Sequence, residues 1–328
     1  MKAALLYEKD DMRIVDLPMP TVGPNHVLLH VKAAKICPTD LRKYRLGSKD
    51  ARIHNLPMNL CHEYTGEITE VGENVKQFKP GMRVTGFGFA GNVEYVALDT
   101  NPNNPFAASS ILELPPNVSY EEGSFVIPLS ENIHCIVDQA MLKFGQTIVI
   151  VGAGQMGLQQ ANVARWCGAN VIVTDLDEAR LAIAKELGAD AVINPAKENV
   201  VDAVKKANNG QLADCSVATL GVPPVIQQAI DVTRNCARVV VFGGTPAGVI
   251  MQFNPNDIHY SEKTMIGVEG TGVPPNRHPE MRPYALRHIA SGKIDIKKLI
   301  TSVMPMTDIV KAYEMIEKKE ALSIVLTP

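Results

Sequence analysis

The feature that most constrains the fold is a regular alternation of short apolar runs with amphipathic stretches, which begins near residue 136. The apolar runs are TIVIVG, NVIVTD, AVINP, DCSVAT and ARVVVFGG, and helical patterns such as QMGLQQANVARWCG and DEARLAIAKELG separate them. Short, wholly apolar runs bounded by turn signals are typical of strands that are buried on both faces. The alternation therefore predicts an α/β domain built of βαβ units, with helices on both faces of a doubly wound parallel sheet.

The segments on either side have a different pattern of apolar and polar residues. Before the alternation, short alternating runs such as HVLLHVKAA, YTGEITEVG and NVEYVAL favour antiparallel strands. After it come two amphipathic helices around a short strand, and the chain closes on the strand-like ALSIVLTP. A chain of 328 residues exceeds the usual size of one domain. We expect two domains, with a C-terminal segment that returns to the first.

Composition excludes several classes of partner. The formal net charge is −3, from 32 basic and 35 acidic residues, and no basic run carries interleaved aromatic residues. Binding to nucleic acid or to an anionic membrane is therefore not expected. The apolar stretch at the N-terminus is too short for a signal-peptide core, and six scattered cysteines indicate thiols or metal ligands. We expect a cytoplasmic protein without structural disulfides.

The stretch VIVGAGQMG predicts a phosphate-binding turn. Gly152, Gly154 and Gly157 have G-x-G-x-x-G spacing, with Gln155 and Met156 between them, directly after an expected strand and at the start of a helix. The first glycine permits the tight turn, the second lets backbone amides approach a pyrophosphate, and the third lets helix and strand pack closely. This context predicts a dinucleotide site.

A carboxylate at the end of the next strand indicates which dinucleotide binds. Asp175 follows NVIVT about twenty residues after the glycine turn, where it would accept hydrogen bonds from both ribose hydroxyls. It would repel a 2′-phosphate, and no arginine follows it until Arg180, so the sequence favours NAD over NADP. The competing interpretation is that Asp175 caps the next helix, a role that Asp177 fills equally well.

Two short motifs in the N-terminal part carry candidate metal ligands and catalytic groups. KICPTD contains Cys37, Thr39 and Asp40, and NLCHEYTGEI contains His62 and Glu63. Thiolate and imidazole are ligands that zinc prefers, and a catalytic zinc needs three protein ligands with one position open. Taken singly, each of these residues also has an ordinary structural interpretation as a buried or turn residue.

Taken together, the motifs resemble the medium-chain dehydrogenase/reductase superfamily, and within it the zinc-dependent alcohol and polyol dehydrogenases. The resemblance runs nearly end to end, and it rests on ICPTD, CHEYTGEITEVGENVKQFKPGMRV, VSYEEGSFVIPLS, GAGQMG and the closing IASGKIDIKKLITSVMPMTDIVKAYEMIE. It implies a GroES-like, mostly β catalytic domain (1–129 and 269–328) and a Rossmann domain (130–268). It also implies one catalytic zinc per chain and a homodimer or homotetramer.

The resemblance also implies roles for individual residues. Cys37 and His62 match the zinc ligands, and Thr39 matches the hydroxyl that contacts the substrate alcohol. Asp40 matches the carboxylate that orients the ligand histidine. Glu63 matches the glutamate beside the zinc, which becomes a ligand in some members.

The chain departs from the family pattern at several positions. No cysteine lies between Val84 and Val118, so the lobe that holds a structural zinc in many members is expected to be absent. Cys61 replaces a glycine, and we expect it to be a buried thiol. The position of the third zinc ligand falls on Ile127, which cannot bind metal. Glu131 is about one helical turn further on, so we consider both Glu131 and Glu63 as replacements, with a helix-start role as the alternative for Glu131.

The sequence thus predicts an NAD-dependent, zinc-dependent oxidoreductase that interconverts a secondary alcohol, polyol or sugar-type substrate and its ketone. Two alternatives stay open. The chain could be a zinc-free quinone or enone reductase on the same fold, or a dinucleotide-binding protein without catalytic activity.

Overall fold

The computed structural model describes residues 1–50, 52–88, 90–101, 111–245, 248–269 and 278–328. The chain divides into two compact units, of which the first combines Met1–Pro128 with Arg282–Pro328 and the second is Leu129–Met281. The sequence places the corresponding changes after residues 129 and 268. Helices α3 (Val126–Ile133) and α9 (His278–Ala290) contain the points at which the chain passes from one unit to the other.

The first unit is built on a mixed sheet in the order β13-β14-β3-β4-β5, with β6 also paired to β3. Its strands are β3 (His26–Lys35), β4 (Glu63–Val71), β5 (Arg83–Phe87), β6 (Tyr95–Asp99), β13 (Ser302–Pro305) and β14 (Ile324–Thr327). Val325 of β14 is opposite Lys35 of β3 in an antiparallel pair. The C-terminal strand therefore completes the sheet that the N-terminal part begins.

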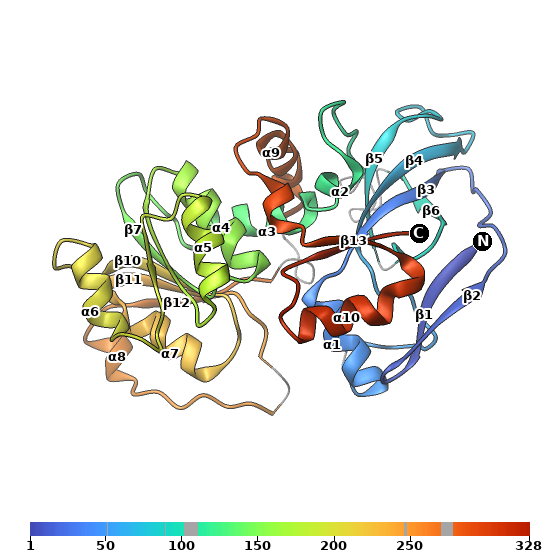
Figure 1. The fold of residues 1–328 in the computed structure, drawn as a ribbon. Coiled ribbons are helices and arrows are strands. Elements are labelled where there is room, and N and C mark those ends of the chain that lie inside the picture. Colours follow the sequence, from blue (N-terminus) through green and yellow to red (C-terminus); the bar gives the residue numbers. More distant parts are fainter. Residues whose placement is uncertain (51, 89, 102–110, 246–247, 270–277) are drawn as a thin grey trace. The chain divides into compact units, whose positions relative to one another are not determined.

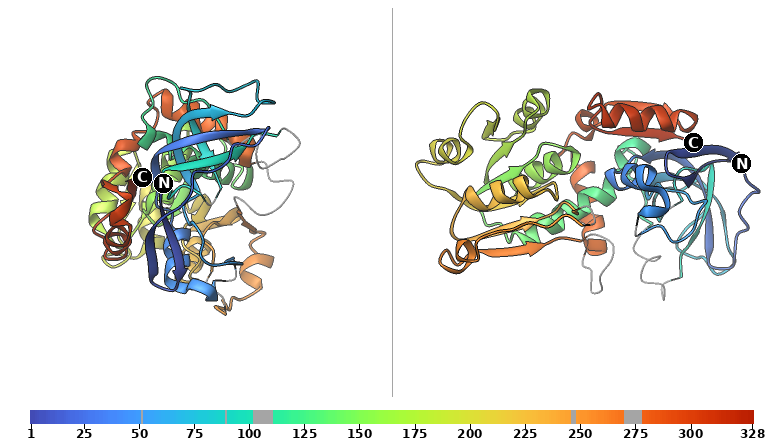
Figure 2. Two further views of the ribbon diagram at one scale, coloured as in Figure 1. Left: turned by 90° about the vertical axis from the view of Figure 1, so that its right-hand side faces the viewer. Right: turned by 90° about the horizontal axis from the view of Figure 1, so that it is seen from below.

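Smaller elements surround this sheet (Figure 1). They are the hairpin of β1 (Lys2–Glu8) and β2 (Asp11–Asp16), helices α1 (Pro38–Leu46), α2 (Tyr120–Gly123) and α10 (Ile309–Glu317), and 3-10 turns at Gly47–Lys49, Ile296–Leu299 and Met306–Asp308. One apolar cluster joins β1, β3 and β4 to α10 and β14. Both chain termini lie in this unit, close to each other in all three views (Figures 1 and 2).

The second unit contains a wholly parallel sheet in the order β12-β11-β10-β7-β8-β9. Its strands are β7 (Thr147–Val151), β8 (Asn170–Thr174), β9 (Ala191–Ile193), β10 (Ala213–Ala218), β11 (Thr233–Val241) and β12 (Thr264–Gly267). The order reverses between β7 and β10, which is the point where doubly wound sheets bind dinucleotides. All five residues of β7 are buried, as expected for a central parallel strand.

Helices connect the strands of this sheet (Figure 1). They are α4 (Gln155–Trp166), α5 (Glu178–Glu186), α6 (Val200–Ala207), α7 (Pro223–Asp231) and α8 (Asn256–His259), and a π-helix at His134–Gln139 precedes β7. The predicted fold class, a GroES-like mostly β domain with a doubly wound parallel sheet, is confirmed. Among the described residues, no helix has both the length and the apolar character needed to cross a membrane.

Candidate active site

Cys37 occupies the junction between β3 and α1. Pro38 starts the helix, where its fixed φ is favourable and its missing N–H costs nothing. The backbone N–H of Cys37 donates to Oδ2 of Asp40 at 3.0 Å. The side chain of Cys37 is therefore held at the start of a helix whose first turn is fixed by a buried carboxylate.

The same carboxylate also reaches the imidazole of His62. Oδ1 of Asp40 lies 3.3 Å from Nδ1 of His62, and both side chains are almost fully buried. Burial by itself lowers the pKa of His62, but Asp40 and Cys37 outweigh burial and raise this pKa well above its usual value. Because Asp40 engages Nδ1, the ring presents Nε2 on its other side.

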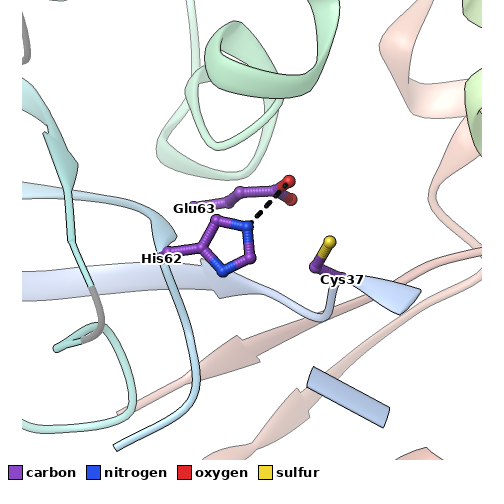
Figure 3. A group of neighbouring side chains, drawn as sticks. All are labelled: Cys37, His62 and Glu63. Carbon is purple, nitrogen blue, oxygen red and sulfur yellow. Dashed lines mark ion pairs between the residues drawn. The ribbon is translucent and has the colours of Figure 1, made fainter. Parts of the chain in front are cut away.

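Three atoms that could bind a metal come together at this point. One atom each from Cys37, His62 and Glu63 lies within 4.8 Å of the other two. Figure 3 shows the thiol, the imidazole and the carboxylate converging, and a dashed line joins Glu63 to His62. Oε1 of Glu63 lies 3.8 Å from Nε2 of His62. Burial and the neighbouring Glu63 raise the pKa of the Cys37 thiol. A thiolate, an imidazole and a carboxylate are the three ligand types that zinc accepts in proteins, so the donor set fits zinc.

Glu63 has a second partner, the ammonium of Lys35, which forms an ion pair with Oε2. Lys35 has no exposed surface, and Glu63 is 2% exposed. Burial lowers the pKa of Lys35, but Glu63 and Cys37 outweigh it, and the net effect is a raised pKa. Lys35 ends β3 and Glu63 begins β4, so the pairing of these two strands brings the charges together.

Cys61 is a buried thiol, as the sequence predicts. It is 1% exposed, and its Sγ donates to the backbone oxygens of Lys35 at 3.6 Å and Glu63 at 3.5 Å. Thr39 is partly exposed in the first turn of α1, one residue before Asp40.

The glycine turn in the second unit has the shape that its spacing predicts. Gly152 has φ +111°, and a Cβ on Gly157 would lie 1.9 Å from the backbone oxygen of Gly152. A Cβ on Gly154 would meet no atom within 4 Å. Gly154 is the N-cap of α4, which begins at Gln155 and Met156. The turn thus needs glycine at its first and third positions for packing, and the second position is left open for a ligand.

Asp175 lies just after β8 and is tied to this turn. Its Oδ2 accepts from the backbone N–H of Ala153 at 2.6 Å, and its Oδ1 accepts from the N–H of Asp177 at 2.9 Å. Asp177, not Asp175, caps α5, and it also pairs with Arg180 at 3.7 Å. The alternative interpretation of Asp175 as a helix cap is therefore wrong, because the cap belongs to its neighbour.

Comparison with known proteins covers parts of both units. The model of the zinc-binding dehydrogenase family matches residues 152–291, and that of the alcohol dehydrogenase GroES-like domain matches residues 23–104. The chain is 30% identical to sorbitol dehydrogenase of Gallus gallus, over 99% of this chain and 95% of the relative. This chain belongs to the zinc-dependent medium-chain dehydrogenases.

Other members of the medium-chain dehydrogenases are similar over their full length. L-threonine 3-dehydrogenase of Rhizobium etli is 26% identical, over 99% of this chain and 98% of the relative. The crystal structure of 2R,3R-butanediol dehydrogenase from Bacillus subtilis superposes with a TM-score of 0.86 at 26% identity, covering 100% and 99% of the two chains. The chain is thus an oxidoreductase of the alcohol dehydrogenase type, a class that uses a nicotinamide cofactor and a catalytic zinc.

Two residues distinguish this medium-chain dehydrogenase from the family pattern in the region of the third ligand. Ile127, at that position, is 2% exposed in α3. Glu131 is the sixth residue of α3, which has no acidic residue in its first turn. The helix-start explanation for Glu131 is therefore wrong, because the macrodipole acts mainly within the first turn. Glu131 belongs to the second unit, and its role as a ligand stays a prediction.

Sequence reasoning missed Lys35. The available signal was a lysine at the end of the apolar strand HVLLHVKAAK, two residues before Cys37. A lysine at the end of a strand usually reaches solvent. The burial of Lys35 and its ion pair with Glu63 are therefore evident only in the tertiary structure.

Proposed function

We propose that this chain is an NAD-dependent, zinc-dependent dehydrogenase that interconverts a secondary alcohol of the polyol or sugar type and its ketone by hydride transfer. The observation that carries the proposal is the convergence of Cys37, His62 and Glu63 within 4.8 Å. The similar proteins named above are a sorbitol, a threonine and a butanediol dehydrogenase, which supports a substrate with a secondary hydroxyl.

In this proposal Cys37, His62 and Glu63 hold the zinc, and Glu131 is a further candidate ligand. Zinc, when bound, supplies the Lewis acidity that stabilises negative charge on the substrate oxygen at neutral pH. Thr39 would accept a hydrogen bond from the substrate hydroxyl and relay its proton toward solvent by giving up its own hydroxyl proton. Asp40 holds the ring of His62 in one orientation and leaves Nε2 for the metal, which is the usual role of a carboxylate behind a ligand histidine.

NAD is the proposed cofactor, and its nicotinamide would supply the acceptor for the hydride. The turn from Gly152 to Gly157 and the N-terminus of α4 bind the pyrophosphate, and Asp175 accepts from the ribose hydroxyls. The preference for NAD over NADP rests on the carboxylate of Asp175, which repels a 2′-phosphate. Arg180 is the nearest arginine after Asp175, and its ion pair with Asp177 opposes a role in binding that phosphate.

We further propose a homodimer or homotetramer in the cytoplasm, with a small molecule as substrate and without a structural zinc. The last point is supported by the absence of cysteine between Val84 and Val118. A sedimentation experiment on the purified protein decides the oligomeric state.

Metal analysis combined with an NAD-reduction screen over alcohols, polyols and sugar alcohols tests the function. About one zinc per chain with turnover supports the proposal. Turnover without metal supports the zinc-free reductase, and bound NAD without turnover on the whole panel supports a non-catalytic protein. C37S is expected to lose both zinc and turnover, because it removes the only thiolate of the donor group.

The third ligand is tested separately, by comparing E63Q with E131A. If Glu63 is the ligand, E63Q loses zinc affinity and E131A keeps it. If Glu131 has replaced the ligand lost at Ile127, the result is reversed.

A further inference from the structure

A buried lysine ammonium lies beside the proposed metal centre. Lys35 is fully buried and forms an ion pair with Oε2 of Glu63. Its Nζ also lies 5.2 Å from the centre of the Phe125 ring, a distance typical of a cation–π contact. A charge this deep in a protein is costly unless it is paired, so the ion pair with Glu63 is a condition for burying Lys35.

The backbone around this pair is fixed by a third side chain. The thiol of Cys61 donates to the carbonyl oxygens of both Lys35 and Glu63. These two residues are the last of β3 and the first of β4, two strands that pair from Val27 with Val71 to Ala34 with Tyr64. The pairing of β3 with β4, together with the thiol of Cys61, therefore holds the backbone of Lys35 next to that of Glu63.

The two carboxylate oxygens of Glu63 face different partners. Oε2 contacts Lys35, and Oε1 faces Nε2 of His62 at 3.8 Å, on the side of the donor group. The ammonium is thus a positive charge that already balances Glu63. A divalent ion bound by Cys37, His62 and Glu63 brings a second positive charge to the same carboxylate.

We propose that Lys35 acts through Glu63 as an internal cation that lowers the affinity of this centre for zinc. The inference rests on the proposed function, because it takes Cys37, His62 and Glu63 as the ligands. Two like charges that share one buried carboxylate repel each other, and in a protein interior the repulsion is much less screened than in water. Lys35 is therefore a positioning residue of the centre and sets how tightly the metal is held.

The test measures the zinc dissociation constant of metal-stripped protein by competition with a chromophoric chelator at one fixed pH. K35M removes the charge, K35Q removes the charge but keeps a hydrogen-bond donor for Glu63, and K35R keeps the charge. K76M is the matched control, since Lys76 is an exposed lysine of the same unit. Circular dichroism establishes that each variant is folded, and cobalt absorption bands show whether thiolate ligation is kept.

We expect K35M and K35Q to bind zinc at least tenfold more tightly than the wild type, with K35R and K76M within threefold of it. K35Q provides the test if K35M does not fold, because its amide still pairs with Glu63. Zinc affinity that is unchanged or weaker in the folded neutral variants overturns the inference. C37S separates the two proposals: unchanged zinc affinity in C37S overturns the proposed ligand set, whatever the Lys35 variants do.

A wild-type protein that binds no zinc is also informative. In that case zinc binding gained by K35M or K35Q supports the inference, and no gain in either variant overturns it.

Discussion

Asp40 and His62 form a buried pair in which the carboxylate makes two contacts that set the geometry of the site. Its Oδ1 lies 3.3 Å from Nδ1 of the imidazole, and its Oδ2 accepts from the backbone N–H of Cys37 at 3.0 Å. One carboxylate therefore fixes the relative position of two proposed zinc ligands that come from separate motifs.

Replacing Asp40 by asparagine is expected to weaken zinc binding about tenfold to a hundredfold, the usual effect of losing the partner of a ligand histidine. The amide oxygen of the new side chain still accepts from the N–H of Cys37, so the start of α1 is kept. The amide nitrogen replaces the oxygen that faces Nδ1 of His62, so it donates to Nδ1 and favours the tautomer whose Nε2 carries the proton and cannot bind metal. Chelator competition measures the effect. Unaltered zinc affinity in a folded D40N variant contradicts this role.

Two glycines of the turn are expected to respond differently to alanine. G157A places a methyl group 1.9 Å from the backbone oxygen of Gly152, and we expect it to lower the free energy of unfolding by about 1–3 kcal/mol. G154A has open space and φ −70°, so its stability stays near that of the wild type. Its methyl group instead obstructs the pyrophosphate, and we expect weaker NADH binding. Urea unfolding and a fluorescence titration separate the two effects, and equal stability of both variants would show that the turn relaxes.

The preference for NAD is expected to depend on the charge of Asp175. D175N is predicted to raise the dissociation constant for NADH about tenfold, because the contacts with the ribose hydroxyls are weakened. The difference between the dissociation constants of NADH and NADPH is expected to narrow, because the repulsion of the 2′-phosphate is reduced. D202N is the control, because Asp202 is an exposed aspartate of the same unit and its substitution removes the same charge. Equal cofactor preference in D175N and the wild type argues against Asp175 as the selectivity residue.

Stability is expected to fall in mildly acidic solution through His288 in α9. Burial, followed by the charge of Lys293, lowers the pKa of His288 to about 4. In the unfolded chain this pKa is roughly 6.5, so between these values the unfolded state binds more protons. The free energy of unfolding therefore falls as the pH is lowered from about 6.5 to about 4.

Because His288 is partly exposed, we expect it to contribute about 1–2 kcal/mol to this loss. The measurement is urea unfolding of the wild type and H288N at several pH values. The two curves are expected to run parallel above about pH 6.5, and the stability of the wild type is expected to fall relative to that of H288N between about pH 6.5 and about pH 4. Parallel curves throughout the acidic range rule out His288 as the cause.

Much of the organisation could be predicted from the sequence because it depends on local pattern. Buried parallel strands need continuous apolar runs, and a tight strand-to-helix turn needs glycine, so β7 and the turn that begins at Gly152 are evident in TIVIVGAGQMG. The residue types that zinc prefers, at Cys37 and His62, are also evident in the sequence, as is the buried thiol of Cys61.

What the sequence by itself determined is which elements form and where reactive side chains occur along the chain. The tertiary structure decided which side chains meet: Lys35 with Glu63, and Asp40 with both Cys37 and His62. It also decided that Asp177, and not Asp175, caps α5. The physical reason is that periodicity reports the burial of single residues, whereas a contact between distant residues depends on strand pairing and on the entry angle of a helix, which no local pattern contains.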